Sequence, residues 1–234
     1  MEELNMKNLI SLCLAMTMLL GSMVGCGKTP TSSSGNPSNS EGGGLGTPQT
    51  FKFGLTVAST HPYSIAAQNF AELVEEKSGG NMTVDLYYDS SLGDDAALME
   101  SMQMNAVTFA LVGPAGIAPM CPIYEFFDLP CLFATRDAAY AFQESEPVLE
   151  LMDSLSANGL RGLGFYENGY YAISNNAKEI TTVDGLNNLK LRSMTSEMAI
   201  KSWECLNVQP VAMAFGELFM AMQTGTVDGQ EPTI

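Results

Sequence analysis

Basic side chains are scarce in this chain of 234 residues. Its 10 lysines and arginines face 26 aspartates and glutamates, which gives a formal net charge of −16. Because a nucleic-acid-binding protein needs a concentrated basic face to neutralise phosphates, we expect no nucleic-acid partner. Charged residues make up only 15% of the chain and apolar residues 46%, so the composition is not that of a disordered acidic protein and suits a folded core.

Histidine is limited to a single residue, His61, so the sequence has no histidine cluster that would bind a metal. The sequence also lacks a Gly-x-Ser-x-Gly elbow, a Gly-x-Gly-x-x-Gly loop and a Walker loop. Asp94 and Asp95 are a candidate carboxylate pair, but two acids at a predicted helix start are more typical of a helix cap. We therefore expect no metal, no cofactor and no enzymatic activity, with a hydrolase as the competing class.

The five cysteines form no Cys-x-x-Cys pair and no metal-binding spacing. Cys121, Cys131 and Cys205 each have apolar neighbours, which favours buried free thiols. A disulfide between Cys121 and Cys131 remains the alternative.

The first 25 residues have the features of a bacterial lipoprotein signal peptide. Residues 9–24 are uncharged and mostly apolar, and this run is shorter than the roughly 20 residues of a membrane-spanning helix. At the end of this run, the segment from Met23 to Cys26 resembles a lipobox, in which the cysteine is lipidated after cleavage. Translation from Met6 would give a more usual signal start than Met1. The alternative for Cys26 is a stray thiol behind an uncleaved anchor.

A flexible linker is expected over residues 26–48. It consists almost entirely of Gly, Ser, Thr, Pro and Asn, with Leu45 as its single large apolar residue. Such a segment cannot bury enough apolar surface to offset the entropy cost of ordering, and it would reach about 25 Å. We therefore predict an extracytoplasmic protein that is anchored to the membrane through Cys26.

From residue 49 onward, strand and helix patterns alternate. This order is typical of α/β units with mainly parallel sheets, whose ligands bind at the carboxyl ends of the strands. Strands are predicted at 51–57, 82–88, 108–112, 162–166, 190–192, 211–214 and from 227, and helices at 62–77, 94–105, 137–143, 147–157, 196–206 and 217–223.

Arg192 is the basic residue best placed for ligand binding. It ends a predicted strand and is followed by a predicted helix start at Ser196. A guanidinium can bind a carboxylate with two charge-assisted hydrogen bonds, and the helix start would add backbone donors. On this pattern alone, a surface arginine without a ligand remains the alternative.

Several segments resemble the solute-binding proteins of TRAP (tripartite ATP-independent periplasmic) transporters. The most specific match is the run from Ala214 to Glu231, which is similar to the family signature FGELYTALQTGVVDGQEN. The segment from Asp184 to Arg192 is similar to the family's DLKGLKIR region. Weaker similarities lie at His61–Tyr63, Phe70–Gly80, Ser91–Asp95 and Asp128–Pro130.

The resemblance implies an α/β, two-lobed fold of the type II periplasmic-binding-protein class, with mainly parallel sheets. Residues 49–164 would form the first lobe and residues 165–234 part of the second, because the family continues beyond the Gly-Gln-Glu strand. We expect this sequence to be truncated there, with an incomplete second lobe. The protein would capture a small organic acid, a carboxylate, and deliver it to the integral-membrane subunits of a TRAP transporter. The alternative is a binding module of another uptake system, or a sensor, for a sugar-like or aromatic solute.

The resemblance also implies the ligand-binding residues. An arginine that matches Arg192 holds the ligand carboxylate in the family, and an aromatic residue that matches Phe215 packs on the ligand. The other expected contacts are Asp95, Gly113, His61, Tyr171 and Glu231. Two positions depart from the family pattern, since Tyr171 stands where many members have a second arginine and Pro232 where they have asparagine. These departures favour a ligand with an apolar or sugar-like body.

Overall fold

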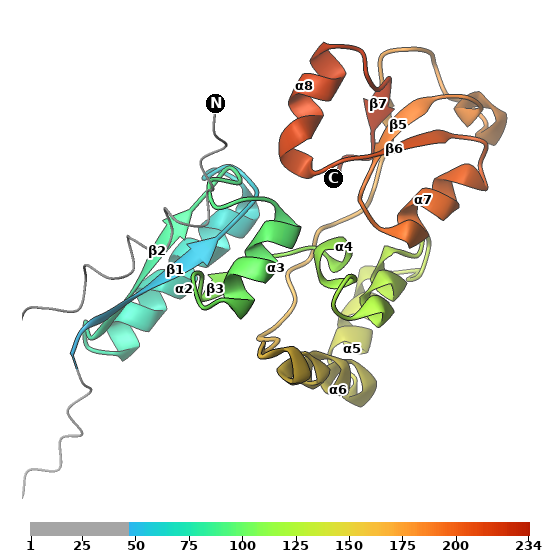
Figure 1. The fold of residues 1–234 in the computed structure, drawn as a ribbon. Coiled ribbons are helices and arrows are strands. Elements are labelled where there is room, and N and C mark those ends of the chain that lie inside the picture. Colours follow the sequence, from blue (N-terminus) through green and yellow to red (C-terminus); the bar gives the residue numbers. More distant parts are fainter. Residues whose placement is uncertain (1–46) are drawn as a thin grey trace, which may run out of the picture. The chain divides into compact units, whose positions relative to one another are not determined.

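The computed structural model describes residues 47–234, which contain one parallel and one mixed β-sheet with helices around them (Figure 1). The predicted signal peptide, the predicted lipidation site Cys26 and nearly all of the predicted linker lie outside the described residues. Within the described part, no helix is both long and apolar enough to cross a membrane.

The first sheet has the strand order β2-β1-β3, and all of its pairs are parallel. Its strands are β1 (Gln49–Gly54), β2 (Met82–Tyr87) and β3 (Phe109–Ala110), and the helices α2 (Pro62–Lys77) and α3 (Asp95–Gln103) connect them. Phe53, Leu55 and Ala67 form the buried core of this half. The predicted alternation of strands and helices is confirmed here, and it directs the carboxyl ends of all three strands toward the same edge.

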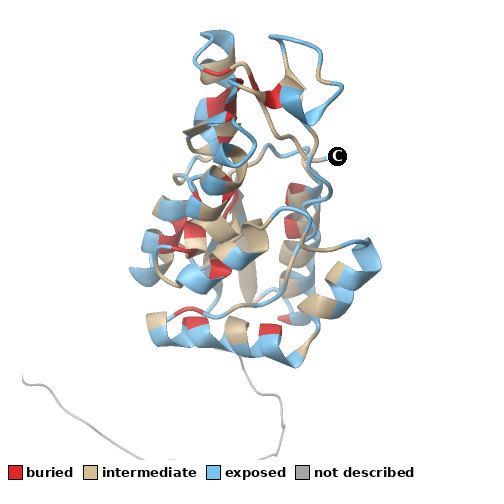
Figure 2. Ribbon diagram, turned by 90° about the vertical axis from the view of Figure 1, so that its right-hand side faces the viewer, coloured by how far each residue is buried: buried red, intermediate tan, exposed pale blue. Residues whose placement is uncertain are grey.

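Short helices continue the chain after β3. They are α4 (Pro114–Ile117), the 3₁₀ helix η1 (Pro122–Asp128), α5 (Arg136–Gln143), α6 (Glu146–Ser154) and the 3₁₀ helix η2 (Leu155–Asn158). A second buried cluster, with Met99, Tyr124, Leu155 and Leu160, packs these helices against α3. Figure 2 shows buried and exposed residues within the same helices, although α5 contains no buried residue.

The second sheet has the order β4-β7-β5-β6. Its strands are β4 (Ser174–Asn175), β5 (Lys190–Ser193), β6 (Gln209–Ala212) and β7 (Gly229–Gln230), and the helical elements are η3 (Val183–Leu186), α7 (Glu197–Glu204), η4 (Phe215–Glu217) and α8 (Leu218–Gln223). Strand β5 pairs in parallel with β6 and β7, whereas β4 pairs antiparallel with β7. Leu186, Leu189, Leu191 and Val208 form the core beneath it.

The strand predicted at residues 162–166 is wrong, because this segment joins no sheet. Side-chain packing holds it instead. A Cβ added at Gly162 would lie 2.9 Å from the Cβ of Met152, and the Tyr166 ring lies 6.0 Å from the Tyr63 ring. The apolar alternation therefore reflects packing against helices, and the next strand begins only at Ser174.

The cysteine predictions are partly wrong. Cys121, Cys131 and Cys205 are free, so the alternative disulfide between Cys121 and Cys131 is not present. The thiols are nevertheless not buried as expected, since Cys131 and Cys205 are exposed. Cys131 lies in a turn with a φ of 56° and Cys205 caps the end of α7, and both places face away from the cores.

Candidate functional site

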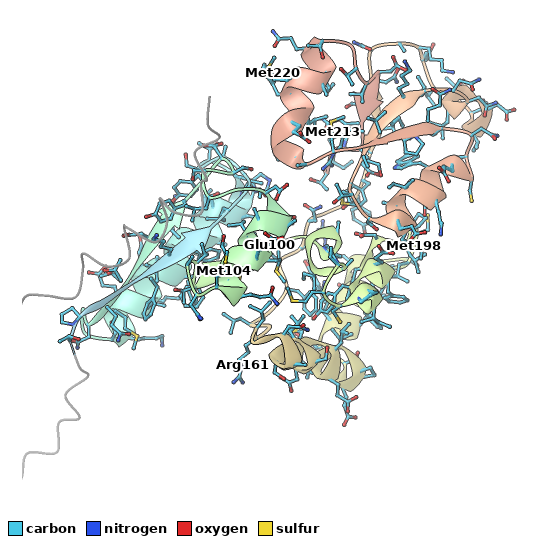
Figure 3. The ribbon with its side chains drawn as sticks, in the orientation of Figure 1. Glu100, Met104, Arg161, Met198, Met213 and Met220 are labelled. Atoms are coloured by element: carbon cyan, nitrogen blue, oxygen red, sulfur yellow. The ribbon has the colours of Figure 1, made fainter. Side chains whose placement is uncertain are left out.

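Arg192 lies near the carboxyl end of β5 and is half-buried. Its Nε and Nη2 groups donate hydrogen bonds to the carbonyl oxygen of Met213, at 3.3 and 3.2 Å, and Met213 lies on the connection from β6 toward α8 (Figure 3). The guanidinium carbon lies 6.0 Å from the centre of the Phe215 ring. Because a guanidinium has five N–H groups, donors remain for a bound anion.

The sheet fixes the position of this cation. Strand β5 pairs on one side with β6, with Arg192 opposite Val211, and on the other side with β7. Alternation along β5 directs Leu191 and Ser193, both 0% exposed, to the other face. Burial lowers the pKa of Arg192, while the charges of Glu231, Tyr171 and Asp95 raise it. These three acidic groups are therefore its electrostatic neighbours.

Glu231 follows β7 and points toward the helix α7. Its Oε2 accepts a hydrogen bond of 3.1 Å from the indole Nε1 of Trp203, and its Oε1 is buried without a donor in the described part of the chain. Burial raises the pKa of Glu231 to about 7, and the charges of Arg192 and the Trp203 hydrogen bond oppose this rise. Burial therefore makes the charged form of Glu231 less favourable than that of an exposed glutamate.

Asp128 is a buried carboxyl group that the sequence analysis did not single out. It ends η1, and its Oδ2 is buried without a hydrogen-bond donor among residues 47–234. Burial raises the pKa of Asp128 to about 6, the Ser196 hydroxyl lowers it and the charge of Glu125 raises it. Asp128 also raises the pKa of Glu231, so the two carboxyl groups are neighbours. The only sequence signal was its place in the Asp128–Pro130 turn, which did not indicate a role.

Tyr171 is held next to these groups by a chain of hydrogen bonds. The Tyr63 hydroxyl donates to Oδ1 of Asn168 at 2.8 Å, and Nδ2 of Asn168 donates to the Tyr171 hydroxyl at 3.2 Å. Desolvation of the Tyr171 hydroxyl raises its pKa, and the charges of Glu231 and Asp128 raise this pKa further. The Asn168 hydrogen bond and the charge of Arg192 lower it. The predicted residues Arg192, Phe215, Tyr171 and Glu231 are thus brought together, and Asn168 and Tyr63 are additional residues that position Tyr171.

Asp95 and Gly113 form a second predicted part of the site. The backbone N–H of Gly113 donates to Oδ2 of Asp95 at 3.0 Å. Burial raises the pKa of Asp95, the Gly113 bond lowers it and Asp94 raises it, with a smaller lowering by Arg192. Asp94 itself caps α3, because its Oδ1 accepts the N–H of Ala97 at 2.9 Å. The predicted cap is therefore confirmed, and Asp94 and Asp95 do not act as a pair.

His61 acts locally as the N-cap of α2. Its Nδ1 accepts a hydrogen bond of 3.2 Å from the N–H of Tyr63, and the two rings lie 4.8 Å apart. Among the described residues, no hydrogen bond, ion pair or ring pair joins His61 directly to Arg192 or Tyr171, and its hydrogen bond with Tyr63 leads to Tyr171 through Asn168. Its predicted ligand contact stays a prediction.

An open depression lies beside Phe215, since its lining includes both chain neighbours of that residue, Ala214 and Gly216. It is lined by Asp89, Ser90, Gly93, Asp94, Ala97, Ala214, Gly216 and Glu217. Its ionisable residues are all acidic, and two of them are engaged in local bonds, Asp94 with Ala97 and Glu217 with the N–H of Ala214. The depression therefore brings no second cation to the site. In the described part of the chain, no three His, Cys, Asp or Glu side chains gather in a way that would hold a metal ion.

Comparison with known proteins places these observations in a family. Residues 53–234 match the DctP model, "Bacterial extracellular solute-binding protein, family 7". The chain is 34% identical over 192 residues to the C4-dicarboxylate-binding periplasmic protein DctP of Rhodobacter capsulatus, which covers 80% of this chain and 56% of that protein. It is 30% identical over 188 residues to the 2,3-diketo-L-gulonate-binding periplasmic protein YiaO of Escherichia coli, covering 80% of this chain and 57% of that protein.

A solved structure shows the same fold. The sugar acid binding protein DctPAm from Advenella mimigardefordensis, crystallised in complex with galactonate, superposes with a TM-score of 0.78 at 35% identity, covering 80% of this chain and 60% of that one. The chain thus spans little more than half the length of the curated relatives named here. The expected resemblance to TRAP solute-binding proteins and the expected two-lobed α/β fold are confirmed. The chain belongs to family 7 of the bacterial extracellular solute-binding proteins.

Proposed function

We propose that this protein is an extracytoplasmic receptor that captures a small organic acid and delivers it to the membrane subunits of a TRAP transporter. The observation that carries the proposal is Arg192, a half-buried cation at the end of β5 with free guanidinium donors beside an aromatic ring. A ligand carboxylate can use these donors in charge-assisted hydrogen bonds. The three relatives named above support this ligand class, because the ligand in each of their names is a carboxylic acid.

The remaining expectations from the sequence belong to the same proposal. Residues 1–25 would be the signal peptide, Cys26 would carry the lipid anchor and residues 26–48 would tether the binding domain to the membrane. Residues 49–164 and 165–234 would contribute to the two lobes. The role is binding and transfer of the solute, with no enzymatic step.

Two exposed aromatic side chains favour a ligand with a sugar-like body as well as a carboxylate. Phe215 and Tyr171 are each 51% exposed and lie beside Arg192. Aromatic faces of this kind can pack on the C–H surface of a polyol. A module that binds a neutral sugar for another uptake system or for a sensor is the second candidate. The two candidate functions differ in one respect, because only the organic-acid receptor requires a negatively charged ligand.

Replacing Arg192 tests the proposed function. We expect Arg192→Ala to weaken galactonate binding at least about 100-fold, because a charged hydrogen bond contributes about 1.5–3 kcal/mol and the cation makes more than one. Isothermal titration calorimetry on the full-length protein, with galactonate and succinate as probes, measures the effect. The matched control is Arg161→Ala, which removes an exposed arginine at the start of an unpaired segment (Figure 3).

The result has clear alternatives. Unchanged affinity in Arg192→Ala, with a melting temperature like that of the unsubstituted protein, would overturn the proposed role of this cation. Binding of a neutral sugar in preference to both acids would support the second candidate. Arg192→Lys keeps the charge without the planar fork, and we expect it to retain part of the affinity.

A further inference from the structure

The sequence contains two Asn-Gly pairs, Asn158-Gly159 and Asn168-Gly169. Asparagine is most prone to spontaneous deamidation before glycine, because the glycine backbone nitrogen attacks the carbonyl carbon of the asparagine side chain without hindrance from a side chain of its own. The attack closes a five-membered succinimide ring, which requires the asparagine backbone to leave helical geometry. The local fold therefore decides how fast each pair reacts.

The fold protects the first of these pairs. Asn158 ends the 3₁₀ helix η2 and is only partly exposed, and the N–H of Gly159 donates a hydrogen bond of 3.0 Å to the backbone oxygen of Ser156. The attacking nitrogen is thus engaged, and this turn would have to open before the ring could close. Such local opening costs free energy, so it slows the reaction.

The second pair lacks this protection. Asn168 and Gly169 are exposed and lie outside the helices and sheets, and within residues 47–234 the N–H of Gly169 donates no backbone hydrogen bond. Gly169 has a φ of 101°, and a Cβ at this position would lie 2.7 Å from the backbone oxygen of Ile234. The chain conformation therefore requires glycine here, which keeps an unhindered nucleophile next to an exposed asparagine.

Two hydrogen bonds hold the Asn168 side chain, but neither involves the atoms that react. Oδ1 accepts from the Tyr63 hydroxyl at 2.8 Å, and Nδ2 donates to the Tyr171 hydroxyl at 3.2 Å. The reacting atoms are Cγ of Asn168 and the backbone nitrogen of Gly169. Oδ1 gains negative charge during the attack, and a donor at that oxygen stabilises the transition state. The bonds that position Tyr171 therefore leave Asn168 open to reaction.

We propose that Asn168 is a site of spontaneous deamidation and that this modification weakens ligand binding. The Gly169 nitrogen loses its proton to hydroxide and bonds to Cγ of Asn168, and the Cγ–Nδ2 bond breaks to release ammonia, which takes up a proton from water. A water molecule then opens the succinimide at one of its two carbonyl groups, which gives aspartate or isoaspartate. The reaction is independent of the proposed function, whereas its effect on binding rests on that function.

Either product changes the surroundings of Tyr171. An ionised carboxyl group has no hydrogen to donate, so the donation to the Tyr171 hydroxyl is lost, and a negative charge is added beside a site proposed to bind an anion. Isoaspartate also lengthens the backbone by one methylene group. This change lies two residues before Tyr170, which exchanges backbone hydrogen bonds of 3.2 and 2.9 Å with Ile234. Tyr171 would therefore move relative to the site.

Peptide mass spectrometry of the full-length protein tests the modification site. The folded protein is incubated at pH 7.5 in water labelled with heavy oxygen, which marks only the acids formed during the incubation. We expect Asn168 to deamidate at least about 10-fold faster than Asn158, because Asn158 must first leave its helical turn. The control is the same chain unfolded in guanidinium chloride, in which the two Asn-Gly pairs should react at similar rates.

Calorimetry with galactonate tests the effect on binding. Asn168→Asp reproduces one of the two products, and Asn158→Asp is the matched control with the same change of charge. We expect Asn168→Asp to weaken galactonate binding at least about 5-fold, since it adds a negative charge near the proposed ligand, and Asn158→Asp to leave the affinity unchanged.

The outcomes separate this inference from the proposed function. Equal deamidation rates at Asn158 and Asn168 in the folded protein, or no labelled acid at Asn168, would overturn the modification site. Unchanged galactonate affinity in Asn168→Asp would overturn its effect on binding. If the unsubstituted protein bound neither galactonate nor succinate, the proposed function would fall together with this effect, while mass spectrometry would still decide the modification site.

Discussion

At the scale of single residues, Glu231 is a proposed ligand contact whose burial also affects the stability of the fold. Its side chain accepts one hydrogen bond from Trp203 and leaves the other oxygen without a donor, so the buried carboxylate is poorly solvated. Burial is accordingly the main cause of its raised pKa, about 7. Such a buried carboxyl group lowers the free energy of unfolding at pH values where it is ionised, while it leaves one oxygen without a hydrogen bond.

A pH titration of stability tests this account of Glu231. In the unfolded chain the carboxyl loses its proton near its ordinary pKa of 4.5, whereas in the folded protein it keeps the proton until about pH 7. Between these values the folded state binds more protons, so the free energy of unfolding should fall as the pH rises from about 4.5 to 7. Asp128 adds a fall of the same sign between 3.8 and about 6.

The Glu231→Gln variant should flatten the upper part of this decline, since glutamine keeps an acceptor for Trp203 and does not ionise. Denaturant unfolding of the ligand-free protein at pH 5 and pH 8, compared with Glu150→Gln, which removes one exposed acid from α6, measures the difference. An identical decline in the Glu231→Gln variant and the unsubstituted protein would show that this carboxyl is not buried in solution.

The residues of the site differ in how far the sequence predicts them. Arg192 and Phe215 lie in motifs that resemble a known family, and the structure brings them together. Asp128 lies only in the weaker Asp128–Pro130 similarity, which indicates no role, and Asn168 was not singled out, because the positions of both arise from packing. The carboxyl of Asp128, at the end of η1, lies near Ser196 at the start of α7, and Asn168 joins Tyr63 to Tyr171. Contacts between distant segments of this kind are not encoded in local spacing.

At the scale of elements, the pairing of β4 with β7 depends on a glycine. A Cβ at Gly229 would lie 2.1 Å from the backbone oxygen of Ser174 and 2.7 Å from the Cβ of Asn175. Because the first of these atoms belongs to the backbone, it cannot move aside at low cost. Only glycine therefore allows β4 and β7 to approach each other as they do.

Gly229→Ala should destabilise the protein by about 1–3 kcal/mol, the usual cost of overpacking, and weaken ligand binding because Glu231 follows two residues later. The control is Gly164→Ala, where a Cβ would meet nothing within 4 Å. Chemical denaturation and calorimetry of both variants measure the two effects. Stability of Gly229→Ala equal to that of Gly164→Ala would mean that the two strands do not pair this closely in solution.

The elements were predicted best where one local pattern dominates. Helix α2 was predicted with the observed bounds, because Pro62 at its start and the glycines after Lys77 are strong signals. The helices α4 and η1 were missed, since both are short and are placed by packing against α3 and α7. The segment 162–166 shows the opposite error, in which an alternating pattern suits both a strand and an extended segment that packs on helices.

At the scale of the whole molecule, the net charge of −16 opposes the approach of an anionic ligand. The field of surface charges extends about 30 Å at 10 mM salt but only about 8 Å at 150 mM, whereas Arg192, in its proposed role, would act on a bound ligand at contact distance. Salt should therefore change the association rate and the final affinity differently. This difference separates the effect of the overall charge from that of the site.

We expect the association rate of galactonate to increase several-fold when the ionic strength is raised from 10 to 150 mM, because screening removes the long-range repulsion. Trp203 is the single tryptophan of the chain and donates to Glu231, so its fluorescence reports binding at the site in a stopped-flow experiment. Trp203→Phe should abolish the signal, which confirms its source. A rate that falls with salt would mean that the local field of Arg192 reaches farther than the acidic surface, and that the ligand is steered toward the site despite the overall charge.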